Sequence, residues 1–298
     1  MKRRSELAAL FGAAVLFAPA AASAYCRTAN CPTHEGAWQV CLPAESDDCG
    51  TVLWWKSRCL GFTLQKDASS QVNLATAETV FKKAFDTWMN ADCGSGAHPS
   101  VTIDYQGPVT CDKHEYNKDK TKKNANIIMF RDDSWPYEGT SNIIALTTVT
   151  YNLDTSEIYD ADMEINSADI DNFTTGDTNV GYDLLSVATH ETGHFLGLAH
   201  SHDSTATMYP DYKTTTTTLR DLADDDVDAI CATFPPDSPS EVCDDEPRHG
   251  FSELCAADQV AETGCSCSVP VGGGRPEAWG LVGLAAAAAL RRRRRAKG

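Results

Sequence analysis

The sequence predicts an α+β domain, because helical and strand-like patterns alternate along the chain. Apolar residues recur at helical spacing over residues 73–90, and a second helical pattern begins near Asp183. Short runs of apolar and β-branched residues, separated by turn residues, favour strands between and before these helices. At 298 residues the chain has room for one or two domains with a substantial core.

The strands are expected in chain order on local patterns. An apolar stretch with Trp54, Trp55 and Phe62 predicts the first strand, which leads into the helix over residues 73–90. That helix carries an apolar stripe expected to face the core: Val80, Phe81, Ala84, Phe85 and Trp88. Four later runs predict further strands: 101–105, 126–130, 143–151 and 157–166.

The second helix contains the run HETGHFLGLAH, which begins at His190 and has the spacing of a zinc site. Residues four apart share a helix face, so His190 and His194 can aim at one point. Glu191 is rotated by roughly 100° and is placed to hold a zinc-bound water. Gly197 permits a left-handed backbone that ends the helix, so that His200 can return as the third ligand. Three protein ligands and one open position are typical of a catalytic zinc.

Local signals bound this helix and the last one. Asp183 is a plausible N-cap, and Gly193 inside the helix, at a cost of about 1 kcal/mol against alanine, indicates close packing beside the metal. Acidic residues 224–226 open a final helix and complement its dipole. Ala223 stands where a capping serine is expected, which predicts a weaker start for that helix.

Eight residues after His200 comes Met208, followed by Tyr209 and Pro210. The pattern HExxHxxGxxH with a downstream Met-turn resembles the metzincin signature, and Ser201 with the Met-Tyr-Pro run resembles its matrixin branch. The resemblance covers roughly residues 50–234, including a helix at 77–88, a strand at 126–130 and a last helix at 224–234.

This resemblance implies a metzincin (zincin-like) fold: a twisted, mostly parallel sheet, an active-site helix and a small C-terminal subdomain. It implies that Met208 forms an apolar floor beneath the three imidazoles. It also implies that the strand at 143–151 is the sheet edge to which an extended substrate peptide adds by backbone hydrogen bonds.

The function predicted is a zinc metalloendopeptidase that acts on a protein or peptide substrate. The expected zinc ligands are His190, His194 and His200, and Glu191 is the expected general base. The alternative is a non-catalytic zinc-binding surface module with the same fold. An intact Glu191 beside all three histidines favours the enzyme. The sequence predicts neither the cleavage specificity nor the oligomeric state.

The chain departs from vertebrate-type matrixins in one region. They place structural-zinc histidines where this chain has Asp160, Asp162 and Glu164, and no histidine lies between His114 and His190. A second, structural zinc is therefore not expected. The three acidic residues are either calcium ligands, since that ion prefers oxygen, or acidic strand residues without a ligand. His202 lies near the site, but its spacing matches no ligand role.

Several features predict export. Residues 1–24 resemble a secretory signal, with basic residues, an apolar run and a small-residue cleavage site before Tyr25. The 12 cysteines suit an oxidising compartment, and ten of them could form five bridges, for which we favour a Cys93–Cys111 pair. The expected organisation is a signal (1–24), a Cys-rich segment (25–50), the catalytic domain (51–234), a Cys-containing stalk (235–264) and a tail (265–298).

The net charge of −17 argues against nucleic acid or an anionic membrane surface as a partner. The tail has two cysteines, Cys265 and Cys267, then a Gly-rich spacer, an apolar run over 279–290 and a cluster of arginines at 291–295. As a helix the run would span roughly 18 Å, short of the ~30 Å hydrocarbon core. The tail resembles MYXO-CTERM sorting tails, which implies cleavage near Cys265 and an extracellular or outer-membrane surface location. The alternative is a short anchor that stays attached.

Overall fold

The computed structural model describes residues 25–30, 50–137, 142–238 and 243–259, and the backbone of 279–287. The signal segment 1–24 and most of the tail lie outside these residues. The α+β class is confirmed. The helices are α1 (Leu74–Met89), α2 (Leu184–Phe195), the 3-10 helix η2 (Thr218–Arg220) and α3 (Asp224–Thr233). The strands are β1 (Trp54–Trp55), β2 (Cys59–Gln65), β3 (Thr102–Val109), β4 (Ile127–Phe130), β5 (Ile143–Asn152), β6 (Glu157–Ile165), β7 (Phe173–Thr174), β8 (Tyr182–Asp183) and β9 (Trp279–Ala287).

In the described part of the chain, one sheet carries the fold, with the strand order β3-β2-β4-β6-β5-β9 and β1 paired to β6. Strands β1 to β4 and β6 pair in parallel, whereas β5 runs antiparallel to both β6 and β9. Strands β7 and β8 form a separate two-stranded parallel ladder. The mostly parallel sheet that the resemblance implies is therefore present.

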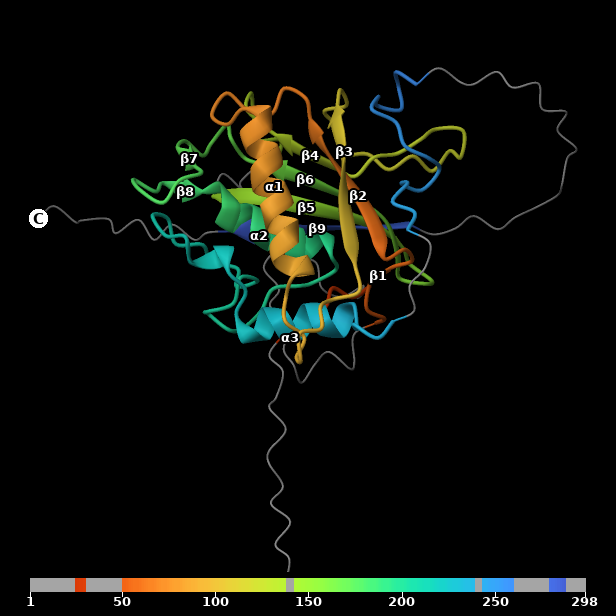
Figure 1. The fold of residues 1–298 in the computed structure, drawn as a ribbon. Helices are drawn as coiled ribbons and strands as arrows, with labels where there is room; N and C mark the ends of the chain where they lie inside the picture. Colours follow the sequence, from red (N-terminus) through yellow and green to blue (C-terminus); the bar gives the residue numbers. More distant parts are fainter. Residues whose placement is uncertain (1–24, 31–49, 138–141, 239–242, 260–278, 288–298) are drawn as a thin grey trace, which may run out of the picture.

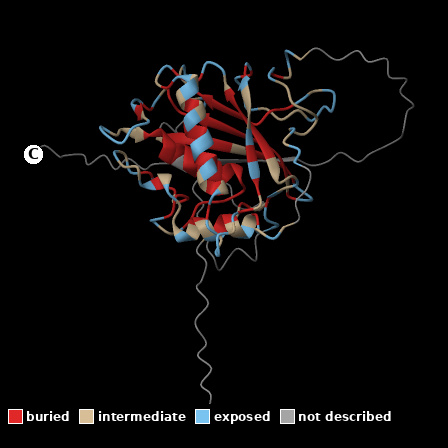
Figure 2. Cartoon of the chain, viewed as in Figure 1, coloured by how far each residue is buried: buried red, intermediate tan, exposed pale blue. Residues whose placement is uncertain are grey.

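Helices α1 and α2 cover the same face of this sheet (Figure 1). Asn73 caps α1 by accepting a hydrogen bond from the backbone N–H of Thr76 at 3.0 Å. The predicted apolar stripe of α1 is buried, and its outer face is exposed (Figure 2). The indole of Trp88 donates to the carbonyl of Thr189 in α2 at 2.8 Å, which fastens the two helices to each other.

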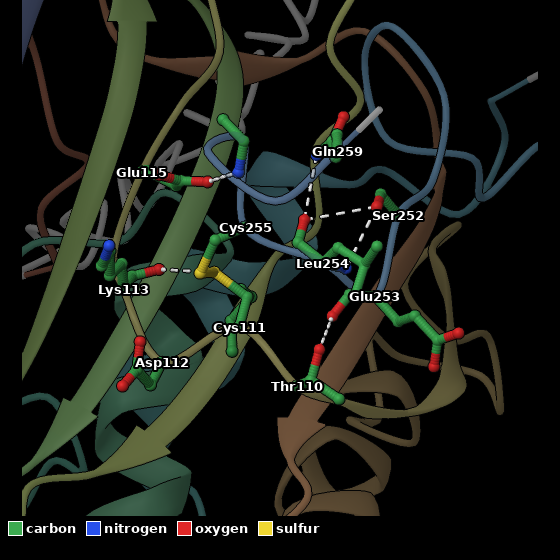
Figure 3. Close-up of a disulfide and its surroundings, with 12 residues drawn as sticks. Thr110, Cys111, Asp112, Lys113, Glu115, Ser252, Glu253, Leu254, Cys255 and Gln259 are labelled. Carbon is green, nitrogen blue, oxygen red and sulfur yellow. Dashed lines mark hydrogen bonds between the residues drawn. A yellow bond between two sulfur atoms is a disulfide. The ribbon is translucent and has the colours of Figure 1, made fainter. Parts of the chain in front are cut away.

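The opposite face of the sheet is covered by the loop at residues 112–124 and by residues 243–259, named here the strap. Three disulfides are described, Cys59–Cys243, Cys93–Cys231 and Cys111–Cys255, and two of them tie the strap to the sheet. Figure 3 shows Cys111–Cys255, beside which Thr110 donates to the carbonyl of Glu253 at 2.9 Å. The Cys93–Cys111 pair expected from the sequence is wrong, because each cysteine pairs with a distant one brought close by the fold.

Residues 25–30 lie against the turn that follows α2. The carbonyl of Cys26 accepts from the N–H of Ala199 at 2.9 Å, and the N–H of Thr28 donates to the carbonyl of Gly197 at 2.9 Å. The segment therefore holds the turn that leads back to His200.

Strand β9 changes one expectation. The resemblance implies that β5 is the free edge of the sheet, but β9 pairs with it from Ile143 to Asn152. An uncovered strand edge offers unpaired N–H and C=O groups, and a segment of this chain occupies them here. Within the described residues, no helix is both long and apolar enough to cross a membrane.

Candidate metal centre and active site

Helix α2 begins where the sequence predicts. The side chain of Asp183 accepts from the N–H of Ser186 at 2.9 Å, which confirms it as the N-cap. Arg220 of η2, which sequence patterns did not single out, grips the same carboxylate with Nε at 2.8 Å and Nη2 at 2.6 Å. This bidentate pair ties the start of the helix to the chain that follows the site.

The structure brings His190, His194 and His200 together in the interior. All three are buried, and their candidate ligand atoms lie within 4.8 Å of one another. Nε2 of His194 and Nε2 of His200 are 3.2 Å apart. Gly197 has a φ of +94°, so the left-handed turn predicted for it is confirmed, and the chain reverses to deliver His200.

Backbone carbonyls orient two of the imidazoles. Nδ1 of His190 lies 2.6 Å from the carbonyl of Thr207, and Nδ1 of His194 lies 2.9 Å from that of Leu198. A carbonyl can only accept, so each Nδ1 carries its proton and each Nε2 keeps a lone pair. Burial lowers the pKa of His190 to about 4 and that of His200 to about 3. The pKa of His194 lies well below its ordinary value, through burial and then the neighbouring imidazoles.

These features fit a zinc ion. Zinc takes neutral imidazole, and two nitrogens at about 2.0–2.1 Å from one tetrahedral ion lie about 3.3–3.4 Å apart, close to the 3.2 Å found here. Nε2 of His190 is buried and has no hydrogen-bond partner among the described residues. A buried polar atom without a partner is costly, and a metal removes that cost.

Gly193 shows how closely the chain packs beneath this centre. A Cβ at this position would collide with Sδ of Met208 and with the indole of Trp88. The close packing predicted from Gly193 is therefore confirmed, and Met208 lies directly against the helix that carries the zinc ligands.

Asp226 links the Met-turn to α3. Its carboxylate accepts from the N–H groups of Thr207 at 2.6 Å, Met208 at 3.0 Å and Ala223 at 2.9 Å. The bond to Ala223 is the half of a capping box that needs no serine, so α3 has a satisfied start despite its alanine. Burial raises the pKa of Asp226 to about 6.

Glu191 is fully buried beside the histidines, and a strand residue holds its carboxylate. The hydroxyl of Thr147 in β5 lies 2.6 Å from Oε2 of Glu191. Sequence reasoning did not find Thr147, because this contact depends on the placement of a strand that lies 44 residues away along the chain.

The three acidic residues of β6 are all buried on the sheet face away from the helices. Oε1 of Glu164 accepts from Nε of Arg131 at 2.5 Å, and its Oε2 lies 3.2 Å from Nδ1 of His114 and accepts from Tyr137. Asp162 accepts two backbone N–H groups, at 2.7 and 2.9 Å. No acidic triplet with metal-ligand spacing occurs among the described residues, so calcium binding stays a hypothesis.

A small pocket opens beside His190. Apolar side chains and two tyrosines form most of its wall: Ile144, Val187, Tyr209, Pro210, Tyr212 and Leu219. The hydroxyl of Tyr212 donates to the carbonyl of Thr216 at 2.9 Å and accepts from the N–H of Asp183 at 2.8 Å, which fixes that wall. His202 is exposed and stands outside the group of three buried histidines.

Comparison with known proteins agrees with the geometry. The family model described as matrixin matches residues 54–234. Human neutrophil collagenase is 29% identical over 181 residues, which are 60% of this chain and 33% of that protein. The metalloendoproteinase 1-MMP of Arabidopsis thaliana is 29% identical over 192 residues, which are 61% of this chain and 44% of the relative.

Matrix metalloproteinase-C of Caenorhabditis elegans is 36% identical over 112 residues, which are 34% of this chain and 18% of that protein. The chain thus spans a third to less than half of the length of the first two of these relatives. The family match covers more than half of this chain and includes all three histidines, Glu191 and Met208. The chain therefore belongs to the matrixin family.

Proposed function

We propose that this protein is an exported zinc endopeptidase with Glu191 as its general base. The observation that carries the proposal is a buried carboxylate next in sequence to a buried set of three neutral imidazoles. A non-catalytic zinc-binding module is the alternative, and it would need the three histidines but not this carboxylate.

Zinc at the three imidazoles would lower the pKa of a bound water from 15.7 towards about 7 and polarise a peptide carbonyl. The protein supplies the proton chemistry. Glu191 would accept the proton of the attacking water and deliver it to the leaving amine. Met208 would support the imidazoles from below, a role for which its packing against Gly193 argues.

The pocket beside His190 supports a preference among substrates. Its lining is largely apolar, so a substrate residue next to the cleaved bond would place an apolar side chain there. A charged side chain would lose its hydration in that pocket without gaining an ionic partner. The substrate would therefore be a protein or peptide with an apolar residue at this subsite.

The proposal for location rests on the sequence. Residues 1–24 would direct export, and the disulfides suit an oxidising compartment. Residues 265–298 would be a sorting tail of the MYXO-CTERM type that is cut near Cys265, leaving the enzyme at the outer surface of the cell. The intact mass of protein recovered from its native cells tests this. Chains that keep residues 279–298 would contradict it.

The test of function is Glu191→Ala. Peptide hydrolysis should be abolished while about one zinc per chain remains, because the glutamate is not a zinc ligand. The measurements are digestion of an unfolded protein substrate and zinc content by elemental analysis.

The control is Glu78→Ala, which removes a partly exposed glutamate of α1 that pairs with Lys82 on the surface. It should keep both zinc and activity. Full residual activity in Glu191→Ala would exclude the glutamate as the base, and a wild-type protein that binds zinc but cleaves no peptide would favour the binding module.

A further inference from the structure

The catalytic carboxylate of a zinc peptidase must hold one orientation, and the structure shows what could hold it here. The last torsion of a glutamate, between an sp³ and an sp² carbon, has broad minima, so packing alone restrains the carboxylate plane weakly. A hydrogen bond from a rigid element narrows that range. Thr147 makes such a bond to Oε2 of Glu191 at 2.6 Å.

The donor is unusually well fixed. Thr147 lies in the middle of β5, is fully buried, and pairs with Met163 of β6 and, through the backbone, with Leu284 of β9. Threonine is β-branched, so its first side-chain torsion is stiff. The hydroxyl also lies 3.3 Å from the carbonyl oxygen of Glu191, but its single proton favours the shorter contact.

The position of Thr147 on the strand makes the contact specific. Along β5, side chains alternate between the two faces of the sheet, and Val149 and Tyr151 share the face of Thr147 in the main core. A side chain that points at α2 from this position would be expected to be apolar, as its neighbours on that face are. A hydroxyl there needs a partner, and the partner is the carboxylate of Glu191.

We propose that Thr147 is a positioning residue of this enzyme, whose hydroxyl orients the carboxylate of Glu191 for proton transfer. The inference rests on the proposed peptidase function and deepens it. Thr147 acts through Glu191 and touches neither the substrate nor the zinc ligands, so its loss should lower the rate of the chemical step and spare substrate binding and zinc content.

The experiment compares Thr147→Val, which keeps the shape and removes the donor, with Thr147→Ser, which keeps the donor. Thr150→Val is the matched control, because it removes a buried hydroxyl from the same strand on the opposite face. On a fluorogenic peptide, Thr147→Val should lower kcat by about tenfold or more, as misplaced catalytic groups do, with KM within about twofold and one zinc bound. Thr147→Ser should recover most of kcat, and Thr150→Val should leave kcat within about twofold.

A second measurement does not use activity. In the zinc-free protein, the denaturation midpoints of Thr147→Val, Glu191→Ala and the double variant should be non-additive, because the first change removes the partner of the second. If Thr147→Val does not fold, Thr147→Ala against Thr147→Ser makes the same comparison of a missing and a retained donor.

The outcomes separate this inference from the proposed function. A wild-type protein without peptidase activity contradicts the function itself. An active wild type whose Thr147→Val variant keeps its kcat, or whose midpoints are additive, contradicts the inference alone. Loss of kcat in Thr147→Ser equal to that in Thr147→Val would also overturn it, since a retained hydroxyl would then be of no use.

Discussion

Two buried polar clusters lie on opposite sides of the central sheet and satisfy their polar atoms in different ways. On the helix side, the imidazoles of His190, His194 and His200 are neutral, and their candidate ligand atoms lie close to one another. On the other side, Glu164 of β6 receives hydrogen bonds from Arg131 and Tyr137 and lies within ion-pair distance of His114.

The difference shows how a ligand site can be told from a structural cluster. Burying a polar atom costs free energy unless it finds a partner. The far-side cluster finds its partners within the protein, through donors from the loop at 112–124 and from Arg131. The histidine cluster keeps lone pairs that face one another, and an ion from outside is needed to satisfy them.

The largest effect should follow from breaking the histidine cluster. His200→Ala leaves two imidazoles where a catalytic zinc uses three protein ligands. Zinc affinity should fall by more than the roughly 10- to 100-fold that accompanies loss of a residue that only supports a ligand, and activity should fall with it. Zinc titration and a peptide assay measure both quantities.

A variant at His200 that kept its metal and its activity would show that another residue is the third ligand. The control is His202→Ala, which changes an exposed histidine two residues away and should alter neither quantity.

A smaller effect should follow from breaking the far-side cluster. Arg131→Met removes the guanidinium that lies 2.5 Å from the fully buried Glu164. Losing one partner of a buried ion pair costs about 3–5 kcal/mol, and His114 and Tyr137 should hold the loss in unfolding free energy near about 3 kcal/mol. Chemical denaturation measures it, while zinc content and kcat of the folded protein should stay unchanged.

The matched control is Lys82→Met in the exposed Lys82–Glu78 pair of α1, which should change the stability by less than about 1 kcal/mol. Equal losses in the two variants would mean that the Arg131–Glu164 pair is no more than a surface contact.

The smallest effect concerns pH. Burial raises the pKa of Asp162 to about 8, and burial and Asp162 raise that of Asp160. The folded state therefore binds more protons than the unfolded chain between about pH 4 and pH 8. The unfolding free energy should fall as pH rises through that window, by at most about 1.4 kcal/mol per pH unit for each group.

Asp162→Asn cannot titrate, and its side-chain oxygen can still accept from the N–H of Ile127. Its stability should depend less steeply on pH than that of the wild type in unfolding curves recorded from pH 5 to pH 8. Parallel curves for the two proteins would contradict the raised pKa of Asp162.

The elements that the sequence predicts correctly are those with local causes. The apolar stripe of α1, the cap at Asp183 and the turn at Gly197 each follow from residues within one or two helical turns. The histidine set follows from spacing on one helix and a single turn after it. Short-range pattern alone is therefore enough to predict these parts of the fold and the site.

The remainder depends on contacts between distant residues. Thr147 reaches Glu191 only because β5 takes its place beside α2, and Arg220 reaches Asp183 only because the chain after the site folds back. The Cys93–Cys111 pair is wrong because proximity in sequence does not decide which cysteines the fold brings together. The pairing of β9 with β5 has no local signal either, since the apolar run of the tail is equally compatible with a helix.

The described disulfides have a consequence for a protein that is proposed to cut polypeptides in its own surroundings. Each of the three joins a cysteine before α2 to one after it, with sequence separations of 184, 138 and 144 residues. A single backbone cut anywhere between Cys111 and Cys231 would therefore leave two pieces linked by all three bonds. Such a nicked molecule would run as one species on a gel without reductant and as two with it, so self-digestion could proceed some way before the active centre came apart.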